Sequence, residues 1–195
     1  MAACSGFVLA GGKSSRMGQE KAFLLFEDEP LVLRLLTIVR SVVEDVSIVG
    51  SQNTFPGFNN VVEDIYKEAG PLAGIHAGLN FSNHEWNLFL AVDQPFMSPL
   101  FLRYLLTEAQ KSPALVTVPR INDMFQPLCA VYRLGFKEIA AQALQTGHNR
   151  IDKLFREQEI RVIDLTEIIR EGFDVGIFTN LNTPQELELA RSNIL

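Results

Sequence analysis

Cysteine is scarce in this chain, and neither cysteine belongs to a metal-binding or disulfide-forming pattern. Cys4 and Cys129 lie far apart, outside any CxxC motif or Cys/His cluster, so neither a zinc module nor a disulfide scaffold is expected. His76, His84 and His148 likewise lack the spacing of HExxH or a similar ligand set. We therefore expect two buried, reduced thiols, and histidines in ordinary packing or surface roles.

Long apolar runs and an excess of basic residues are also missing. The longest apolar stretches, around 31–39 and 88–92, are far shorter than the roughly 20 residues that cross a bilayer, and the N-terminus lacks the basic lead of a signal peptide. A net charge of -6 argues against general affinity for nucleic acid. These features predict a cytoplasmic protein that binds neither membranes nor nucleic acid and holds any phosphate ligand in a local pocket.

No linker, repeat or low-complexity segment divides the chain. Its 195 residues, 47 % of them apolar, suit one domain of ordinary size with a packed core. The sequence therefore predicts a single domain over residues 1–195.

Short apolar runs bounded by turn residues alternate with stretches of helical spacing. The predicted strands are Phe7–Ala10, Val46–Val49, Asn87–Val92, Ala114–Val118 and Leu128–Tyr132, and the predicted helices are Leu31–Val43, Pro71–Phe81, Pro99–Gln110 and Leu134–Leu144. In the more highly charged region 148–173 we expect a helix over Arg150–Glu157 and a strand over Ile160–Leu165. The alternation predicts an α/β fold of Rossmann-like, three-layer type, with a mostly parallel central sheet covered on both faces.

The first predicted strand runs directly into a glycine-rich, cationic loop, Gly11-Gly12-Lys13-Ser14-Ser15-Arg16-Met17-Gly18-Gln19-Glu20-Lys21. Ligands of open α/β sheets bind beyond the carboxyl ends of the strands, which is where this loop must lie. Paired glycines let backbone N–H groups approach an anion, and Lys13, Arg16 and Lys21 supply positive charge. The pattern predicts a cradle for a triphosphate. A simple strand-to-helix turn would explain the glycines but not the three cations.

Two common phosphate-binding loops fail on spacing. The Walker pattern requires Lys-Ser/Thr directly after its second glycine, whereas Gly18 is followed by Gln19, and no register supplies the G-x-G-x-x-G of dinucleotide-binding folds. The loop therefore belongs to neither class.

A carboxylate follows the most apolar strand of the chain. Residues 88–92 read as a buried central strand that ends in Asp93-Gln94-Pro95-Phe96, so Asp93 should point into the same crevice as the glycine loop. Mg²⁺ commonly takes one or two protein carboxylates and fills its octahedron with water and substrate phosphates. Asp93 is therefore the candidate metal ligand. The alternative is that it caps the helix that begins near Ser98.

These motifs together resemble those of the molybdenum cofactor guanylyltransferases, within the nucleotidyltransferase superfamily. The resemblance covers Leu9 to Glu186 in four ordered blocks. The first is L-A-G-G-x-S-x-R-M-G-x-x-K, the second joins Glu63-Asp64 and Gly70-Pro71-Leu72-Ala73-Gly74 with D-x-P-F, the third is Gln126–Tyr132, and the fourth is Thr179–Glu186. The resemblance implies that Leu9, Ala10, Gly11 and Gly12 contact GTP through their backbone, that Lys21 holds phosphate, and that Asp64 contacts the nucleotide. One departure is Gly50, where some family members carry an asparagine that touches the base.

The last block carries an asparagine pair. Asn180 and Asn182 alternate along an extended segment, so their amides should project to one side, and by resemblance they face the metal and the pterin substrate. The alternative is that they are turn-forming residues before a helix capped by Thr183. Gly70, Gly74 and Gly78 are spaced four apart, which suits either close helix-to-sheet packing or close approach to a flat ring.

The resemblance implies a magnesium-dependent transferase that attacks the α-phosphate of GTP with the terminal phosphate of molybdopterin. Because the second pKa of a phosphomonoester is about 6, no general base is required, and Asp93, Lys21 and Arg16 would align the substrates and neutralise charge. Transient contact with other cofactor-biosynthesis proteins is a further expectation. The alternatives are a related enzyme that uses CTP or a sugar phosphate, a non-catalytic nucleotide-binding regulator and, more distantly, a Rossmann oxidoreductase.

Overall fold

The computed structural model describes residues 3–11, 21–155, 160–181 and 186, and its centre is an eight-stranded sheet. Seven strands lie in the order β10-β7-β9-β6-β1-β4-β5, and β8 pairs with β7. The strands are β1 (Cys4–Leu9), β4 (Asp45–Val49), β5 (Val61–Val62), β6 (Trp86–Ala91), β7 (Val116–Ile121), β8 (Met124–Phe125), β9 (Cys129–Arg133) and β10 (Ile160–Asp164). Only β9 and β8 pair with their neighbours in the antiparallel sense. The predicted mostly parallel sheet is confirmed.

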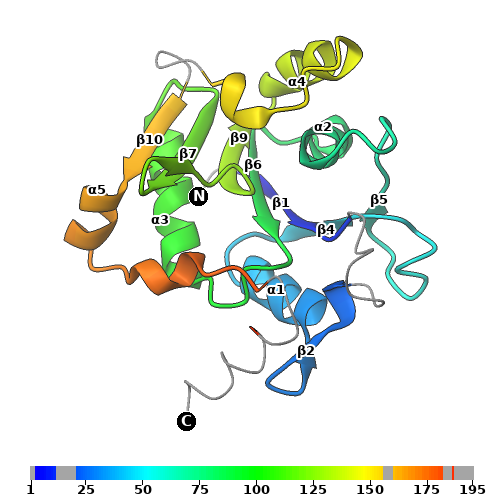
Figure 1. Ribbon diagram of the computed structural model, residues 1–195, viewed down its shortest axis with the longest axis horizontal. Helices are drawn as coiled ribbons and strands as arrows, with labels where there is room; N and C mark the ends of the chain where they lie inside the picture. The colour runs from blue at the N-terminus through cyan, green and yellow to red at the C-terminus, as the bar shows by residue number, and fades with distance from the viewer. Residues whose placement is uncertain (1–2, 12–20, 156–159, 182–185, 187–195) are drawn as a thin grey trace.

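Helices cover both faces of the sheet (Figure 1). They are α1 (Leu31–Arg40), α2 (Pro71–Phe81), α3 (Pro99–Lys111), α4 (Phe136–Gln145) and α5 (Leu165–Arg170). Because side chains alternate along a strand, Val8 and Leu88 join the core under α1 and α3, whereas Phe7 and Phe89 join the core under α2 and α4. The layers are therefore helix, sheet and helix, as the sequence predicts.

Short elements surround this frame. They are the turns η1 (Lys21–Phe23), η2 (Ile151–Lys153) and η3 (Val175–Phe178), and a two-stranded hairpin of β2 (Leu25–Phe26) and β3 (Glu29–Pro30). The predicted helix over Arg150–Glu157 is wrong within the described residues, because only the three residues of η2 form a helical turn there. The predicted strand over Ile160–Leu165 is confirmed as β10, one residue shorter.

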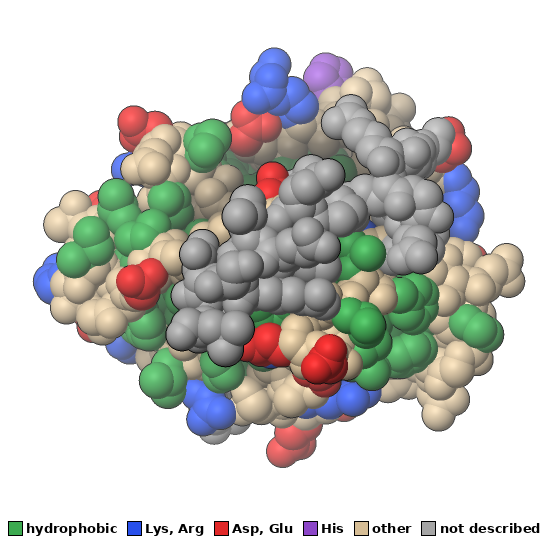
Figure 2. All heavy atoms as spheres, turned by 60° about the horizontal axis from the view of Figure 1, so that its bottom comes forward, with side chains coloured by type: hydrophobic (Ala, Val, Ile, Leu, Met, Phe, Trp, Pro, Cys, Tyr) green, Lys and Arg blue, Asp and Glu red, His purple; other side chains and the backbone are tan. Residues whose placement is uncertain are grey.

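Both cysteines are buried and unpaired, as predicted, and burial raises the pKa of the Cys4 thiol to about 12. Across the described residues, no helix is both long enough and apolar enough to cross a membrane. On the face shown in Figure 2, the described Lys and Arg side chains are scattered around the rim instead of gathering in one stripe.

Candidate active site

The candidate site lies where the strand order reverses. From β1 the chain continues to β4 and β5 on one side and returns to β6 on the other, so the carboxyl ends of β1 and β6 border a topological switch point. Val92 N donates to Leu9 O at 3.0 Å, and Ala10 N donates to Val49 O at 2.9 Å. These bonds place Leu9, Ala10 and Gly11 at the edge of the sheet from which the glycine-rich loop departs.

Lys21 and Asp93 meet at this edge. Lys21 Nζ donates to Asp93 Oδ2 at 3.0 Å, and the two side chains are only 20 % and 24 % exposed. Asp93 is not the helix cap that the alternative interpretation requires, because Ser98 accepts from Phe101 N at the start of α3. The ion pair joins residues 72 positions apart and thereby links the glycine-loop block to the aspartate block.

The asparagine block reaches the same place through its backbone. Leu181 N donates to the carbonyl oxygen of Asp93 at 2.9 Å, so the exposed Asn180 lies next to Asp93. Asn182, Gly12 and Arg16, which the sequence also assigns to the site, lie outside the described residues.

An arginine that the sequence analysis missed supports this arrangement. From α1, Arg34 Nε donates to Pro95 O at 2.9 Å, and Arg34 Nη1 donates to Glu27 Oε2 at 2.7 Å. Its guanidinium lies 4.9 Å from the centre of the Phe26 ring, which in turn packs edge-on against Phe96. Arg34 therefore ties the hairpin that follows Lys21 to the turn that carries Asp93. A lone arginine on an amphipathic helix gives no sequence signal for such a role.

A hollow of about 210 Å³ adjoins the end of β1. It is lined by Ala10, Gly11, Gly50, Ser51, Thr54, Phe55, Glu63, Asp64 and Lys67, so it combines the predicted Ala10, Gly11 and Asp64 with residues the sequence analysis did not select. At Gly50, a Cβ atom would lie 2.8 Å from the Phe55 ring. The ring thus occupies the space beside Gly50, where some family members carry an asparagine.

The two adjacent carboxylates of this hollow differ in their surroundings. Burial raises the pKa of Asp64, and its Oδ1 atom is buried with no hydrogen-bond partner in the described part of the chain. Glu63 is exposed, and the backbone N–H of Gln52 at 2.8 Å and then Lys67 at 3.3 Å lower its pKa. Asp64 is therefore held in a less solvated position than Glu63.

The carboxylate of Asp93 is the candidate ligand for a metal ion at this edge of the sheet. Among the described residues no group of three or more His, Cys, Asp and Glu could hold a metal ion. Asp93 accepts from Lys21 through Oδ2 and offers a hard oxygen ligand. One such carboxylate suffices for Mg²⁺ when substrate phosphates and water complete its shell.

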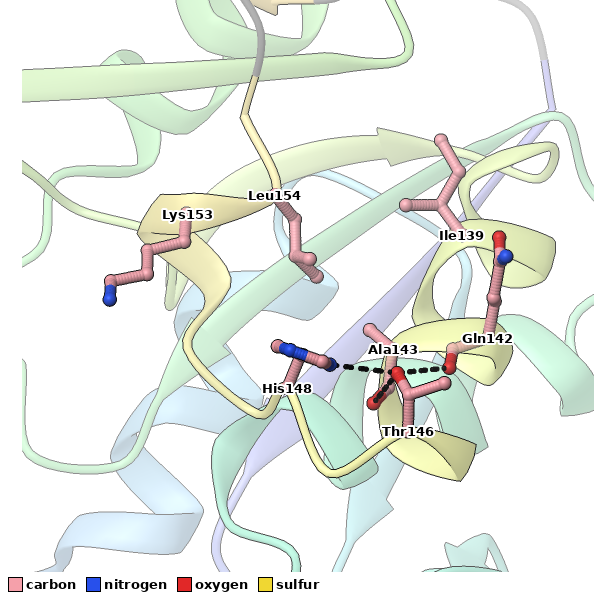
Figure 3. Close-up of a pocket in the computed structure, with 7 residues that line it drawn as sticks. All are labelled: Ile139, Gln142, Ala143, Thr146, His148, Lys153 and Leu154. Atoms are coloured by element: carbon pink, nitrogen blue, oxygen red, sulfur yellow. Dashed lines mark hydrogen bonds between the residues drawn. The ribbon is translucent and has the colours of Figure 1, made fainter.

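A second hollow, of about 350 Å³, lies away from these residues, between α4 and η2 (Figure 3). Thr146 Oγ1 lies within hydrogen-bond distance of Gln142 O, Ala143 O and His148 Nδ1. Lys153 points away from this cluster. None of the residues predicted for the site lines this hollow.

Comparison with known proteins matches the chain to one family. Residues 6–162 match the model of the MobA-like NTP transferase domain. A probable molybdenum cofactor guanylyltransferase of Clostridium perfringens is 31 % identical over 94 % of this chain and 94 % of its own, and a molybdenum cofactor guanylyltransferase of Desulfosudis oleivorans is 32 % identical over 100 % and 97 %.

Two solved structures share the fold. Molybdopterin-guanine dinucleotide biosynthesis protein A from Archaeoglobus fulgidus superposes with a TM-score of 0.84 at 23 % identity, over 97 % of this chain and 98 % of that one. CMP:2-keto-3-deoxy-manno-octonic acid synthetase in complex with CTP has a TM-score of 0.76 at 14 % identity, over 99 % and 98 %. The resemblance predicted from the motifs is confirmed, and the chain belongs to the MobA-like NTP transferase family.

Proposed function

We propose that this protein is a molybdenum cofactor guanylyltransferase that transfers GMP from GTP to the terminal phosphate of molybdopterin, forms molybdopterin guanine dinucleotide and releases pyrophosphate. The names of its relatives support the choice of substrates. The observation that carries the proposal is the pairing of Lys21 with Asp93 at the switch point, beside the hollow that contains Asp64. A cation for the triphosphate and a hard oxygen ligand for a metal ion thus stand together.

The reaction forms one P–O bond and breaks another. An oxygen of the terminal phosphate of molybdopterin attacks the α-phosphorus of GTP, and the bond to the bridging oxygen of the β-phosphate breaks, so that pyrophosphate leaves with the electron pair. The nucleophile is largely ionised at neutral pH because its second pKa is about 6, so the chain need not supply a base. Its residues align the substrates and neutralise charge.

We assign roles to residues on this basis. Lys21 and Arg16 neutralise charge on the leaving pyrophosphate. The backbone of Leu9, Ala10, Gly11 and Gly12 holds the nucleotide, and Asp64 contacts it. Asn180 and Asn182 face the acceptor.

Asp93 would hold Mg²⁺. When bound, this ion neutralises phosphate charge and orients the phosphates. Asp93 fits the role because it is a partly exposed carboxylate already facing a phosphate-binding cation. We further propose that the enzyme works in the cytoplasm and contacts other cofactor-biosynthesis proteins transiently.

Two measurements test the proposal. GTP, Mg²⁺ and molybdopterin added to the protein should yield pyrophosphate and the dinucleotide, and omission of Mg²⁺ should stop the reaction. In thermal shift assays with each of the four NTPs, GTP should stabilise the protein most, because the relatives are named guanylyltransferases. A ligand at about 100 times its Kd adds roughly 2.7 kcal/mol to the free energy of unfolding, which such an assay detects. Equal or greater stabilisation by CTP would favour the rival enzyme class. Nucleotide binding without turnover would favour a non-catalytic regulator.

A further inference from the structure

Arg120 is a half-buried cation with no ion pair to any described residue. It lies in β7, one residue before the strand ends, and it forms no hydrogen bond or ion pair with any residue that the structure describes. Arginine is almost never taken out of water without a partner. The absence of a partner is therefore a feature to explain.

The nearest carboxylate in register belongs to Asp164, which accepts a helix-capping hydrogen bond and forms no ion pair with Arg120. Asp164 in β10 lies directly opposite Arg120. Its Oδ1 atom accepts from Glu167 N at 2.9 Å and caps α5. On the other side, β8 places the apolar Phe125 opposite Arg120.

The sheet register places Arg120 level with the end of β6, the strand that leads to Asp93. Leu88 and Thr117 both pair with Val131 of β9, so β6 and β7 are level there and remain level three residues later, at Ala91 and Arg120. Two strand spacings separate their backbones by roughly 10 Å. Asp93 follows Ala91 by two residues, so Arg120 lies across β9 from the proposed metal ligand.

Arg120 and the nucleotide hollow share one face of the sheet but lie on opposite sides of Asp93. Val116 and Val118 pack under α2 and α4, and alternation puts Arg120 on that face. Leu9 and Val49, close to Gly74 and Asp64, belong to the same face. In the strand order, the hollow borders β1, β4 and β5, Asp93 follows β6, and Arg120 lies on β7. The hollow, Asp93 and Arg120 therefore follow one another across the strand order.

We infer that Arg120 binds the terminal phosphate of the acceptor, and this inference rests on the proposed function. In-line displacement brings the acceptor oxygen to the α-phosphorus from the side opposite the leaving pyrophosphate. Because the nucleotide hollow lies on the β4 side of Asp93 in the strand order, we place the acceptor on the β7 side. A phosphomonoester brings nearly two negative charges, and the planar guanidinium can bind two of its oxygens at once. Arg120 thereby holds the nucleophile near the α-phosphate. In the competing explanation, Arg120 merely covers Phe125 with its aliphatic stem and keeps its charge in water.

The experiment compares the wild-type protein with Arg120→Gln, Arg120→Lys and a matched control, Arg40→Gln. Arg40 is exposed in the last turn of α1, which leads into β4 at the amino-terminal edge of the sheet, and its change removes the same charge. Molybdopterin binding is followed by pterin fluorescence, GTP binding by calorimetry, turnover by dinucleotide formation and folding by thermal melting.

Arg120→Gln should raise both the Kd and the KM for molybdopterin at least about tenfold, because it removes charge-assisted hydrogen bonds. Its GTP affinity should stay within twofold of wild type. Arg120→Lys should recover part of the loss, and Arg40→Gln should behave as wild type.

Unchanged molybdopterin binding in Arg120→Gln would overturn the inference, and so would a loss confined to GTP affinity. If the wild-type protein makes no dinucleotide, the proposed function fails, whereas the fluorescence titration still judges Arg120 by itself. If Arg120→Gln has a lower melting temperature than wild type, the fluorescence titration of Arg120→Lys decides. A molybdopterin affinity equal to that of wild type would contradict phosphate binding by Arg120, and a lower affinity in the folded Arg120→Lys protein would support it.

Discussion

Single charged residues explain most of the chemistry expected of the crevice. Lys21 and Asp93 are partly shielded from water and neutralise one another. When the substrate binds, the triphosphate would replace Asp93 as the partner of Lys21, and the metal ion would replace Lys21 as the partner of Asp93. Asp64 lacks such a partner at its buried oxygen within the described residues. Asp93 is thus paired with a cation, whereas Asp64 is held where burial disfavours its charged form.

Asp93→Asn should abolish most turnover and leave the fold intact. The amide keeps an oxygen that can accept from Lys21, but it lacks the charge that binds a metal ion, so we expect the rate to fall at least about 100-fold. Dinucleotide formation at saturating Mg²⁺ measures the effect. Asp28→Asn, an exposed position in the β2–β3 turn at φ 63, is the control for loss of one negative charge. Near-wild-type turnover in Asp93→Asn would show that Asp93 is not the metal ligand.

Asp64→Asn should stabilise the nucleotide-free protein at neutral pH and weaken GTP binding. Since burial raises the pKa of Asp64, the folded state holds this proton more tightly than the unfolded state does. The resulting stability is complete below the ordinary carboxyl pKa and is lost as pH rises through the raised pKa. Melting temperatures of wild type and variant should therefore converge in acid and separate at neutral pH.

Glu63→Gln provides the opposite case. The pKa of Glu63 is lowered by Gln52 and Lys67, so its ionised form favours folding above its ordinary pKa, and that contribution is lost in acid. The variant should be no more stable than wild type at neutral pH. A higher neutral-pH melting temperature in Glu63→Gln, or a lower one in Asp64→Asn, would contradict these assignments.

At the scale of elements, α2 fits the sheet only because its glycines bring the two backbones close together. The helix spans the predicted Pro71–Phe81, with proline in its first turn. A Cβ at Gly78 would lie 2.7 Å from the Phe89 ring and 3.1 Å from the Phe7 ring, and these two rings stack with centroids 4.9 Å apart. Of the two alternatives for the glycine spacing, close helix-to-sheet packing and close approach to a flat ligand ring, packing therefore accounts for Gly78.

Gly78→Ala should lower the free energy of unfolding by about 1–3 kcal/mol, since the added methyl overpacks the contact with both rings, although alanine favours a helix by about 1 kcal/mol. Gly57→Ala is the control, because a Cβ there meets no atom within 4 Å. Urea denaturation of both variants gives the comparison. Equal stability of Gly78→Ala and wild type would show that α2 can shift without loss.

Other elements could not be predicted from local sequence. The β2–β3 hairpin turns at Glu27 and Asp28, both at positive φ, where Gly or Asn is the usual signal. Arg34, seven residues after Glu27, pairs with its carboxylate. Helix α1 stops at Arg40, before the predicted Val43, because Ser41 Oγ donates to Ile38 O and the amides of Val42 and Val43 turn back to Val39 O. Such contacts depend on the folded path of the chain.

At the scale of the whole molecule, one sheet separates two apolar cores. Every strand of the sheet contributes to the support of at least one helix layer, which favours cooperative unfolding of the single domain predicted over 1–195. Trp86 lies in β6, next to β1 at the middle of the sheet, beneath the guanidinium of Arg133 at 5.0 Å.

We predict that tryptophan fluorescence and far-ultraviolet circular dichroism report the same urea midpoint, because loss of either core exposes the shared sheet. GTP with Mg²⁺ should move both midpoints together. Two separate transitions would show that the layers unfold independently and would count against one cooperative domain.

The sequence by itself determined the fold class, the main strands and helices, and the family, because apolar periodicity and four ordered motifs are local properties of the chain. It also selected Lys21 as a cation of the glycine-rich loop, Asp93 as the carboxylate after an apolar strand, and Asp64 through the family resemblance. Only the tertiary structure decided that Lys21 meets Asp93 and that Phe55 fills the space at Gly50. It also decided that Arg120 lies level with the end of β6, with no hydrogen bond or ion pair to any described residue. These facts depend on strand order and register, and strand order and register arise from contacts between residues far apart in the chain.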